Sequence, residues 1–190
     1  AIETRRIFKD TAYWNPTITT DADGAASITI TLPDNLTEWR IIARAVTLDT
    51  KVGETIDSIL VTQEVIARPD LPRFSILGDR FAVGVVGQNY TGADQSGQAT
   101  MQADGLLLLD EGSQALSIPN GGSGSASWTA IASHVGTKLV TSTVDLGTSG
   151  DRVELSFVAK PFAVPERVFG SGQVTKDHPV MTETLSIPHN

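Results

Sequence analysis

Short runs in which apolar and polar residues alternate recur along this chain and predict β-strands. In Ala26–Leu32 the apolar Ala, Ile, Ile and Leu share one side, and Ser and Thr share the other. Glu38–Val46 repeats the pattern, with Trp39, Ile41, Ala43 and Ala45 predicted to point inward and Arg40 and Arg44 outward. Turn residues precede the two runs, at Asp21–Gly24 and at Leu32–Thr37. The pattern predicts a β-meander with one buried face and one wet face.

Aromatic residues mark the region before the meander. Phe8–Pro16 contains three large rings and ends at a proline, which cannot donate to a central sheet ladder, so we expect a strand that ends at an anchored corner. An opening strand is predicted over Ile2–Phe8. Its adjacent arginines, Arg5 and Arg6, are expected to form a solvated edge that discourages pairing with other chains.

Proline-containing segments divide the chain. Before the first of them, Lys51–Glu54 is a predicted turn, and Thr55–Ala67 is a predicted strand, in one piece or in two pieces with a bulge. Arg68–Arg73 holds two prolines and favours a short, semi-rigid linker, and Pro161–Pro165 marks a second exit. We therefore expect a β-sandwich over residues 1–68, complete or incomplete, a second sandwich over residues 69–165, and a partial segment over residues 166–190.

The region between the two proline segments predicts a sandwich of seven or eight strands. Their spacing of about 8–12 residues is typical of fibronectin-like folds. The expected strands are Phe74–Leu77, Arg80–Tyr90, Gly97–Ala103, Leu106–Leu109, Gln114–Ile118, Ala126–Ala132, Lys138–Leu146 and Arg152–Val158. Asn120–Ser125 is expected to be a flexible loop. Two further strands, Phe169–Thr175 and Met181–Ile187, are too few to bury a core.

The predicted fold class is therefore all-β, with two antiparallel fibronectin-III or immunoglobulin-like β-sandwiches in tandem and a partial C-terminal β segment. A length of 190 residues is long for one sandwich and comfortable for two. The first residues, Ala1–Arg6, contain neither an initiator Met nor the apolar region of a signal peptide, which is typical of an excised fragment.

Composition narrows the possible functions. A net charge of −8 disfavours binding to nucleic acid or to anionic lipid, because both attract clustered Lys and Arg. No apolar run of about 18 residues occurs, so no membrane span is predicted. Cysteine is absent, which excludes disulfides, thiolate zinc sites and a cysteine nucleophile in this sequence.

Two motifs resemble ligand-binding loops. Asp21–Gly24 could open a calcium loop, but such a loop requires a bidentate Glu at its twelfth position, where Leu32 stands. A hairpin turn is the favoured interpretation, and a surface divalent ion is the alternative. Gly121–Ser125 lacks the Lys-Ser/Thr ending of a phosphate-binding loop, so a flexible loop is favoured there.

Candidates for catalysis are few. The only histidines are His134, His178 and His189, and no nucleophile elbow or zinc-protease motif occurs. We expect His134 to be an exposed turn residue. The sequence predicts no catalytic, cofactor-binding or metal-binding residue, no cofactor and no enzyme activity. The tryptophans Trp14, Trp39 and Trp128 are expected to anchor the core, and the alternative is an exposed platform for glycans or peptides.

The order of motifs in the first part of the chain resembles the alpha-macroglobulin family. The motifs are Tyr13–Trp14 in the aromatic block, the Thr20–Gly24 turn, Leu32–Arg40, Ala43–Ala45 and Gly53. The Tyr-Trp-Asn-Pro spelling is similar to the bacterial branch of that family. The resemblance is specific over residues 2–70 and continues in order and length to about residue 165.

The resemblance implies the scaffold of a broad-spectrum protease inhibitor that traps a protease after cleavage of an upstream bait region. It implies macroglobulin-like domains, with a CUB-like domain beginning at about residue 166 that is interrupted by a thioester domain. The Cys-Gly-Glu-Gln thioester motif is absent from this sequence. The implied partners are target proteases and the neighbouring bait, CUB and thioester domains. The implied location is the bacterial periplasm or cell envelope, with lipid anchoring through a longer chain as one option.

Two functions from other classes stay open at this point. The first is an adhesion or spacer module of the cell envelope. The second is a noncatalytic carbohydrate-binding domain, which requires an exposed aromatic platform.

Overall fold

The computed structural model describes residues 2–163, 169, 174–177, 180 and 182. All regular structure in these residues is β-strand, so the predicted all-β class is confirmed. The strands are β1 (Thr4–Arg5), β2 (Glu38–Val46), β3 (Val52–Leu60), β4 (Val65–Asp70), β5 (Phe74–Ile76), β6 (Arg80–Asn89), β7 (Gln95–Asp104), β8 (Leu106–Leu108), β9 (Ser113–Ile118), β10 (Ser123–Ala132), β11 (Gly136–Asp145) and β12 (Gly150–Lys160).

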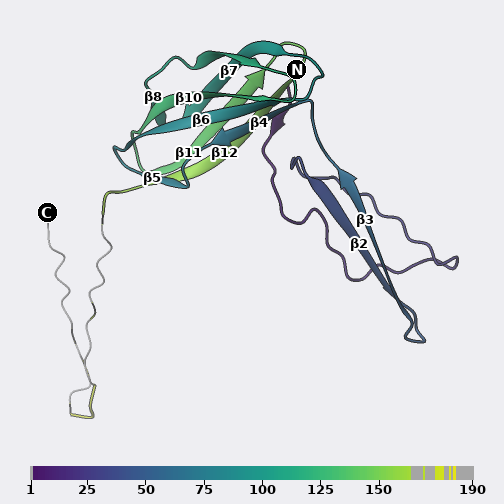
Figure 1. Cartoon of the computed structure of the whole chain (residues 1–190). Coiled ribbons are helices and arrows are strands. Elements are labelled where there is room, and N and C mark those ends of the chain that lie inside the picture. The colour runs from purple at the N-terminus through teal and green to yellow at the C-terminus, as the bar shows by residue number, and fades with distance from the viewer. Residues whose placement is uncertain (1, 164–168, 170–173, 178–179, 181, 183–190) are drawn as a thin grey trace. The chain divides into compact units, whose positions relative to one another are not determined.

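Two sheets pack face to face as a β-sandwich (Figure 1). The larger sheet has six strands in the order β1-β12-β11-β7-β9, with β5 also paired to β12, and the smaller has the order β4-β6-β10-β8. Most neighbouring strands are antiparallel, but β1 and β5 run parallel to β12. Since β11 occupies one edge of β12 from Gly150 to Ala159, β1 and β5 share the opposite edge.

The core lies between the two sheets and is filled by alternate residues of each strand. Trp128 in β10 is 1% exposed, and its indole N–H donates to the carbonyl oxygen of Glu111 at 2.6 Å. The rings of Phe81 and Phe157 meet edge to face with their centroids 6.0 Å apart. The prediction that Trp128 anchors the core is confirmed.

The segment Arg68–Arg73, predicted to be a linker, overlaps the end of strand β4 of the sandwich. β4 pairs with β6 along its whole length, so the predicted boundary between residues 68 and 69 falls within a strand. Pro69 is tolerated because β4 is the edge strand of its sheet. The N–H of Ala67, two residues earlier, points away from β6 toward Asp151. Residue 69 has the same orientation in the strand, so the proline there removes no hydrogen bond to β6.

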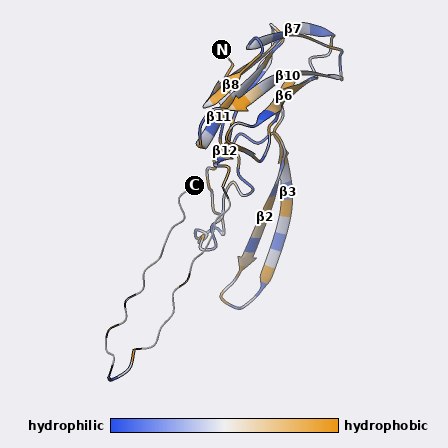
Figure 2. Cartoon of the chain, turned by 90° about the vertical axis from the view of Figure 1, so that its left-hand side faces the viewer, coloured by the Kyte–Doolittle hydropathy of each residue, from blue (hydrophilic) through white to orange (hydrophobic). Residues whose placement is uncertain are grey.

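The residues before β4 form a two-stranded ribbon, and the described residues do not close it into a sandwich. β2 pairs with β3 from Glu38↔Leu60 to Val46↔Val52, so the region from Thr55 to Ala67 is divided between β3 and β4. The strand expected over Ala26–Leu32 joins no ladder. The buried face expected for β2 is also not observed, since no second layer covers the ribbon within the described residues. Figure 2 shows apolar positions along both of its strands.

Two of the three tryptophans do not anchor the sandwich core. Trp14 is 80% exposed, so the prediction that it is a core anchor is wrong for this chain. Trp39 in β2 is partly buried, and its indole nitrogen has no hydrogen-bond partner in the described structure. Both residues belong to the part of the chain whose strands lack a covering layer, which explains the difference from Trp128.

Asn89 organises the turns at one end of the sandwich. It is fully buried, and its Nδ2 donates to the carbonyls of Ala93 (2.8 Å) and Ile118 (3.0 Å). Its Oδ1 accepts from the backbone N–H and the hydroxyl of Thr91 at 3.0 and 2.8 Å. Its backbone N–H donates to Gly122, and its carbonyl accepts from Gly121.

The flexible loop expected over Asn120–Ser125 is shorter in the structure. Gly121 has a φ of 70°, which closes a tight turn that a residue with a side chain rarely adopts. β10 then begins at Ser123. The backbone bonds to Asn89 leave no room for a longer loop.

Lys138 on β11 carries a buried amine. The residue is 0% exposed, and its Nζ has no hydrogen-bond partner among the described residues. Its side chain shares the inner face of β11 with Val140 and Ser142, and lies against Gly105. Because burial of an unpaired ammonium group costs free energy, this side chain opposes folding of the sandwich.

Replacement of Lys138 by methionine is expected to raise the free energy of unfolding by roughly 1–3 kcal/mol, because methionine fills a similar volume without a charge. Denaturant unfolding followed by tryptophan fluorescence measures this change. Lys9→Met is the matched control, since Lys9 is exposed and its substitution should alter stability by about 0.5 kcal/mol or less. A destabilised Lys138→Met variant would show that the amine has a favourable role.

Contacts group Ala1–Lys160 as one compact unit and Pro161–Asn190 as a second. The strands expected over Phe169–Thr175 and Met181–Ile187 lie largely outside the described residues, and so do His178 and His189. In the part of the chain that the structure describes, no helix is long and apolar enough to cross a bilayer.

Candidate functional site

The N-terminal residues enter the sandwich along the edge of β12. Thr4 pairs with Arg152 and Arg5 with Val153. Ile2 lies against Gly150, where an added Cβ would stand only 2.5 Å from the Ile2 Cδ1 atom. Residues 2–5 therefore follow the start of β12 in register, and Gly150 allows the close approach.

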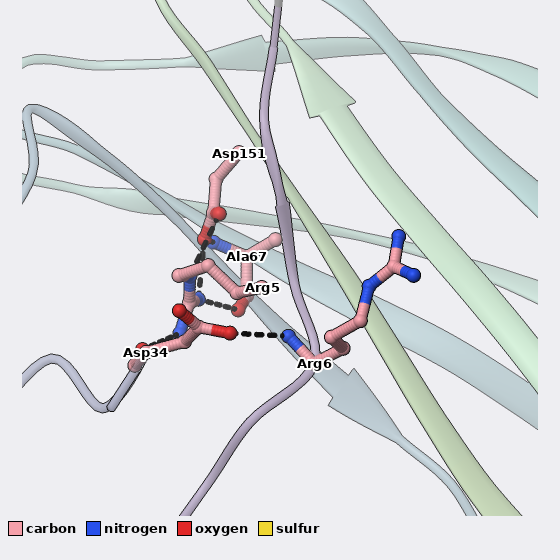
Figure 3. Close-up of polar contacts among 5 residues, drawn as sticks. All are labelled: Arg5, Arg6, Asp34, Ala67 and Asp151. Atoms are coloured by element: carbon pink, nitrogen blue, oxygen red, sulfur yellow. Dashed lines mark hydrogen bonds and ion pairs between the residues drawn. The ribbon is translucent and has the colours of Figure 1, made fainter. Parts of the chain in front are cut away.

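Arg5 lies at the centre of this junction, and Figure 3 shows its partners. Its Nε and Nη2 donate to Oδ1 and Oδ2 of Asp151 at 2.9 and 2.5 Å. Nη1 donates to the carbonyl of Asp34 and Nη2 to the carbonyl of Ala67, each at 3.2 Å. The guanidinium carbon also lies 5.7 Å from the centre of the Phe8 ring. The guanidinium group is thus bound by a bidentate carboxylate, two carbonyls and an aromatic face.

The ion pair is almost completely buried. The side chains of Arg5 and Asp151 are 11% and 1% exposed. This finding corrects the expectation that Arg5 and Arg6 together form a solvated edge. Only Arg6 fits that expectation, with a 59% exposed side chain that approaches Glu154 at 3.9 Å.

The same pair satisfies the free edge of β4. Oδ2 of Asp151 accepts the backbone N–H of Ala67 at 2.8 Å, while Arg5 donates to the carbonyl of the same residue. A neighbouring strand would satisfy both groups in a similar way. The pair therefore joins β1, β4 and β12, and so connects the two sheets on the open side of the sandwich.

Asp34 holds the chain as it leaves β1. Its Oδ2 accepts the backbone N–H groups of Arg6 (2.7 Å) and Ile7 (2.8 Å), and its own N–H donates to the carbonyl of Ile7 at 2.7 Å. Asn35 adds a bond from Lys9 N–H to its Oδ1 at 3.0 Å. The bonds from Ile7 first, and then from Arg6, lower the pKa of the Asp34 carboxyl below its usual 3.8.

Acid is expected to weaken the hydrogen bonds that the backbone N–H groups of Arg6 and Ile7 donate to Asp34. Since the pKa of Asp34 is lower in the folded chain than the usual 3.8, its stabilising contribution is complete above that value and is lost as the pH falls through the folded-state pKa. Hydrogen exchange at the amides of Arg6 and Ile7 should show constant protection from neutral pH to about pH 5, and falling protection below about pH 4.

Two variants test the assignment to Asp34. Asp34→Ala should remove this pH dependence at both amides. Asp49→Ala is the matched control, because Asp49 belongs to the exposed turn between β2 and β3 and bonds to Thr47 and Lys51. Equal pH dependence in wild type and Asp34→Ala would contradict the assignment.

A groove adjoins the junction. It has a volume of about 350 Å³, and its lining includes Arg5, Phe8, Ile66, Pro69, Val153 and Leu155. β1 pairs with β12 up to Val153, and β5 pairs with it from Val158 onward. Between these two points, that edge of β12 has no neighbouring strand in the described structure. The acceptors around Arg5 and the free edge of β12 together fit an extended chain that carries a guanidinium group.

The residues weighed for chemistry from sequence lie elsewhere. Oδ1 of Asp21 accepts the N–H groups of Asp23 and Ala25, so Asp21–Gly24 forms the expected turn, but the residues on either side of it pair in no ladder and no hairpin is formed. His134 is exposed next to Ser133, whose hydroxyl lies 3.2 Å from its Nδ1, as expected for a turn residue. The structure brings neither residue to the junction.

The sequence pattern does not identify Arg5 and Asp151 as a pair, although the alternation along β12 carries one signal for Asp151. In the alternation along β12, Asp151 lies on the same face as Val153, Phe157 and Ala159, which are buried on the inner side of the sheet. A carboxylate on an apolar face requires a cationic partner. The pattern therefore indicates that Asp151 is paired, but it does not identify Arg5.

Comparisons with known proteins agree with this architecture. The model described as the alpha-2-macroglobulin family matches residues 11–101. The chain is 29% identical over 191 aligned positions to an alpha-2-macroglobulin homolog from Nostoc sp., covering 98% of this chain and 10% of that protein. These similarities support a place for this chain among the bacterial alpha-macroglobulins. Over 59 residues, 29% of this chain and 4% of the relative, it is 44% identical to an alpha-2-macroglobulin from Ralstonia nicotianae.

Solved alpha-2-macroglobulin structures share the fold of this chain. The trypsin-activated protein from Escherichia coli aligns with a TM-score of 0.64 at 23% identity, over 76% of this chain and 10% of that chain. A mutant of the Salmonella protein aligns with a TM-score of 0.61 at 24% identity, with the same coverage. The chain spans about a tenth of the length of these relatives.

Proposed function

We propose that this chain is a structural part of a protease-trapping inhibitor and has no catalytic activity of its own. The observation that carries the proposal is the buried Arg5–Asp151 pair, which fixes the N-terminal segment to both sheets of the sandwich. A displacement of residues 2–8 would therefore reach β12 and β4 directly. In a trap whose bait lies before residue 2, such a connection would transmit the effect of bait cleavage to the neighbouring domains.

Solved structures of a relative support the proposed mechanism. Two structures of the Escherichia coli protein are described as activated, one by trypsin and one by porcine elastase. These descriptions concern those proteins. We propose the same response for the parent of this chain, with target proteases as its partners and the periplasm or cell envelope as its location.

The exposed ribbon fits a part of a larger assembly. Its large apolar residues are between 41% and 83% exposed: Ile41, Ile42, Val46, Val52, Ile56, Ile59 and Leu60. Side chains of this kind are usually covered in a stable β-protein. We propose that further strands of the parent complete a macroglobulin-like sandwich around β2 and β3, and that bait, CUB and thioester domains adjoin this chain.

A protease challenge of the full-length parent tests the proposal. A broad-specificity protease should make one early cut shortly before residue 2, followed by a change in native-gel mobility and protection of the protease from a large inhibitor. Asp151→Ala should leave the cut unchanged and reduce the mobility change. A parent that is cut there without any change in shape would contradict the trap.

An alternative function rests on Tyr13 and Trp14, which are 40% and 80% exposed. The carbohydrate-binding interpretation requires such exposed aromatic rings. Binding of the isolated chain to cell-wall glycans, lost in Trp14→Ala, would favour this alternative over the trap.

A further inference from the structure

We infer that the edge of β12 is a docking site for an extended peptide that carries arginine, and that residues 2–8 of this chain are its tethered ligand. This inference does not depend on protease trapping. It concerns what the edge recognises, and it predicts that the edge binds the same peptide when the peptide is supplied as a separate molecule.

The site is built around a guanidinium group. Asp151 is 1% exposed, and of its two hydrogen-bond partners in the described structure, Arg5 and Ala67, Arg5 carries the positive charge. The carbonyls of Ala67 and Asp34 converge on the two terminal nitrogens of the same group. A planar fork of donors fits these acceptors, whereas the compact ammonium of lysine presents no such fork.

Contacts with the edge of β12 also extend along the peptide on both sides of Arg5. The Ile2 side chain packs on Gly150, the backbone of Thr4 and Arg5 pairs with β12, and the Phe8 ring covers the guanidinium group. Backbone pairing at a sheet edge, combined with pockets for particular side chains, is a common mode of peptide recognition. The site therefore favours an apolar residue three positions before the arginine and an aromatic residue three positions after it.

Residues 2–8 can separate from the sandwich. β1 contributes only two residues to the ladder. From Lys9 to Thr31 the chain joins no ladder and is almost entirely exposed. Segments with few buried contacts open with a smaller free energy than the whole domain. Opening of residues 2–8 would expose the Asp151 carboxylate and the groove beside it, ready for another chain.

Binding of a fluorescent peptide with the sequence of residues 2–9 tests the inference. The host is the full chain with Arg5→Ala, which empties the guanidinium position. Fluorescence anisotropy should show saturable binding of the peptide. Citrulline in place of Arg5 in the peptide keeps the shape but removes the charge, and should weaken binding about tenfold or more.

Matched controls use the neighbouring arginine and the host carboxylate. Citrulline in place of Arg6 in the peptide should change the dissociation constant by about twofold or less, because the Arg6 side chain is exposed. The host that carries both Arg5→Ala and Asp151→Asn should bind about tenfold or more weakly. No binding by a folded Arg5→Ala host, or equal binding of the two citrulline peptides, would overturn the inference.

A second preparation covers the case in which the Arg5→Ala chain does not fold. A site-specific protease sequence is inserted after the exposed Thr19 in the otherwise wild-type chain, which is cut after folding. The N-terminal fragment should co-elute with the remainder and be displaced by excess peptide with arginine, but not by the peptide with citrulline at position 5. Loss of the fragment without added peptide, or equal displacement by both peptides, would overturn the inference.

Discussion

Replacement of Asp151 by alanine will lower the free energy of unfolding by about 3–5 kcal/mol, because it leaves the buried Arg5 guanidinium without its counter-charge. The same change removes the acceptor of the Ala67 N–H on the free edge of β4. An unpaired buried charge and an unpaired backbone donor both oppose folding. Urea unfolding followed by the fluorescence of Trp128 measures the loss.

A double-mutant cycle separates the pair from its surroundings. Arg5→Met and Asp151→Leu each leave the other side chain as an unpaired buried charge. The double variant removes both charges and fills much of the same volume. The free energy of unfolding of the double variant should exceed the value expected from adding the two single losses by about 2 kcal/mol or more. Additive losses would show that the two side chains do not act as a pair.

Replacement of Asn89 by aspartate will destabilise the chain by about 3 kcal/mol or more, although the two side chains have nearly the same shape. The Nδ2 group of Asn89 donates to the carbonyls of Ala93 and Ile118 in a fully buried site. A carboxylate places an acceptor oxygen against these two acceptors and adds a buried charge. Thermal and urea unfolding should both show the loss.

Asn120→Asp is the matched control for that change. Asn120 lies in the adjacent exposed turn, and no hydrogen bond of its side chain is recorded in the described structure. The change should alter the free energy of unfolding by about 0.5 kcal/mol or less. If both aspartate variants have similar stabilities, the buried network around Asn89 does not contribute as argued.

The strands of the sandwich could be predicted because each carries its own local signal. β10 alternates so regularly that Trp128, Ala130 and Ala132 all occupy its buried face. Gly78, with a positive φ, lies at a turn that its sequence predicts. Where one face of a sheet is buried by the chain itself, local alternation is sufficient.

Predictions failed where a residue's environment is set by a distant segment. Arg5 and Asp151 are separated by 146 positions, and two adjacent arginines resemble a solvated surface in any local window. Pro69 indicates a break in a central strand, but β4 is an edge strand, and a single sequence does not state the order of strands. Trp14 and the Ala26–Leu32 run carry the signals of buried strands without a covering layer in the described residues.

The parallel pairing of β1 with β12 has a consequence for biosynthesis. The counter-ion of Arg5 is made 146 residues after it, which corresponds to roughly seven to thirty seconds of translation at typical speeds. Loop closure over such a distance is slow compared with hairpin formation, so β6 to β12 can assemble first while the leading residues wait undocked. During that interval chaperones have access to Ile2–Phe8, and newly made copies are most exposed to strand exchange.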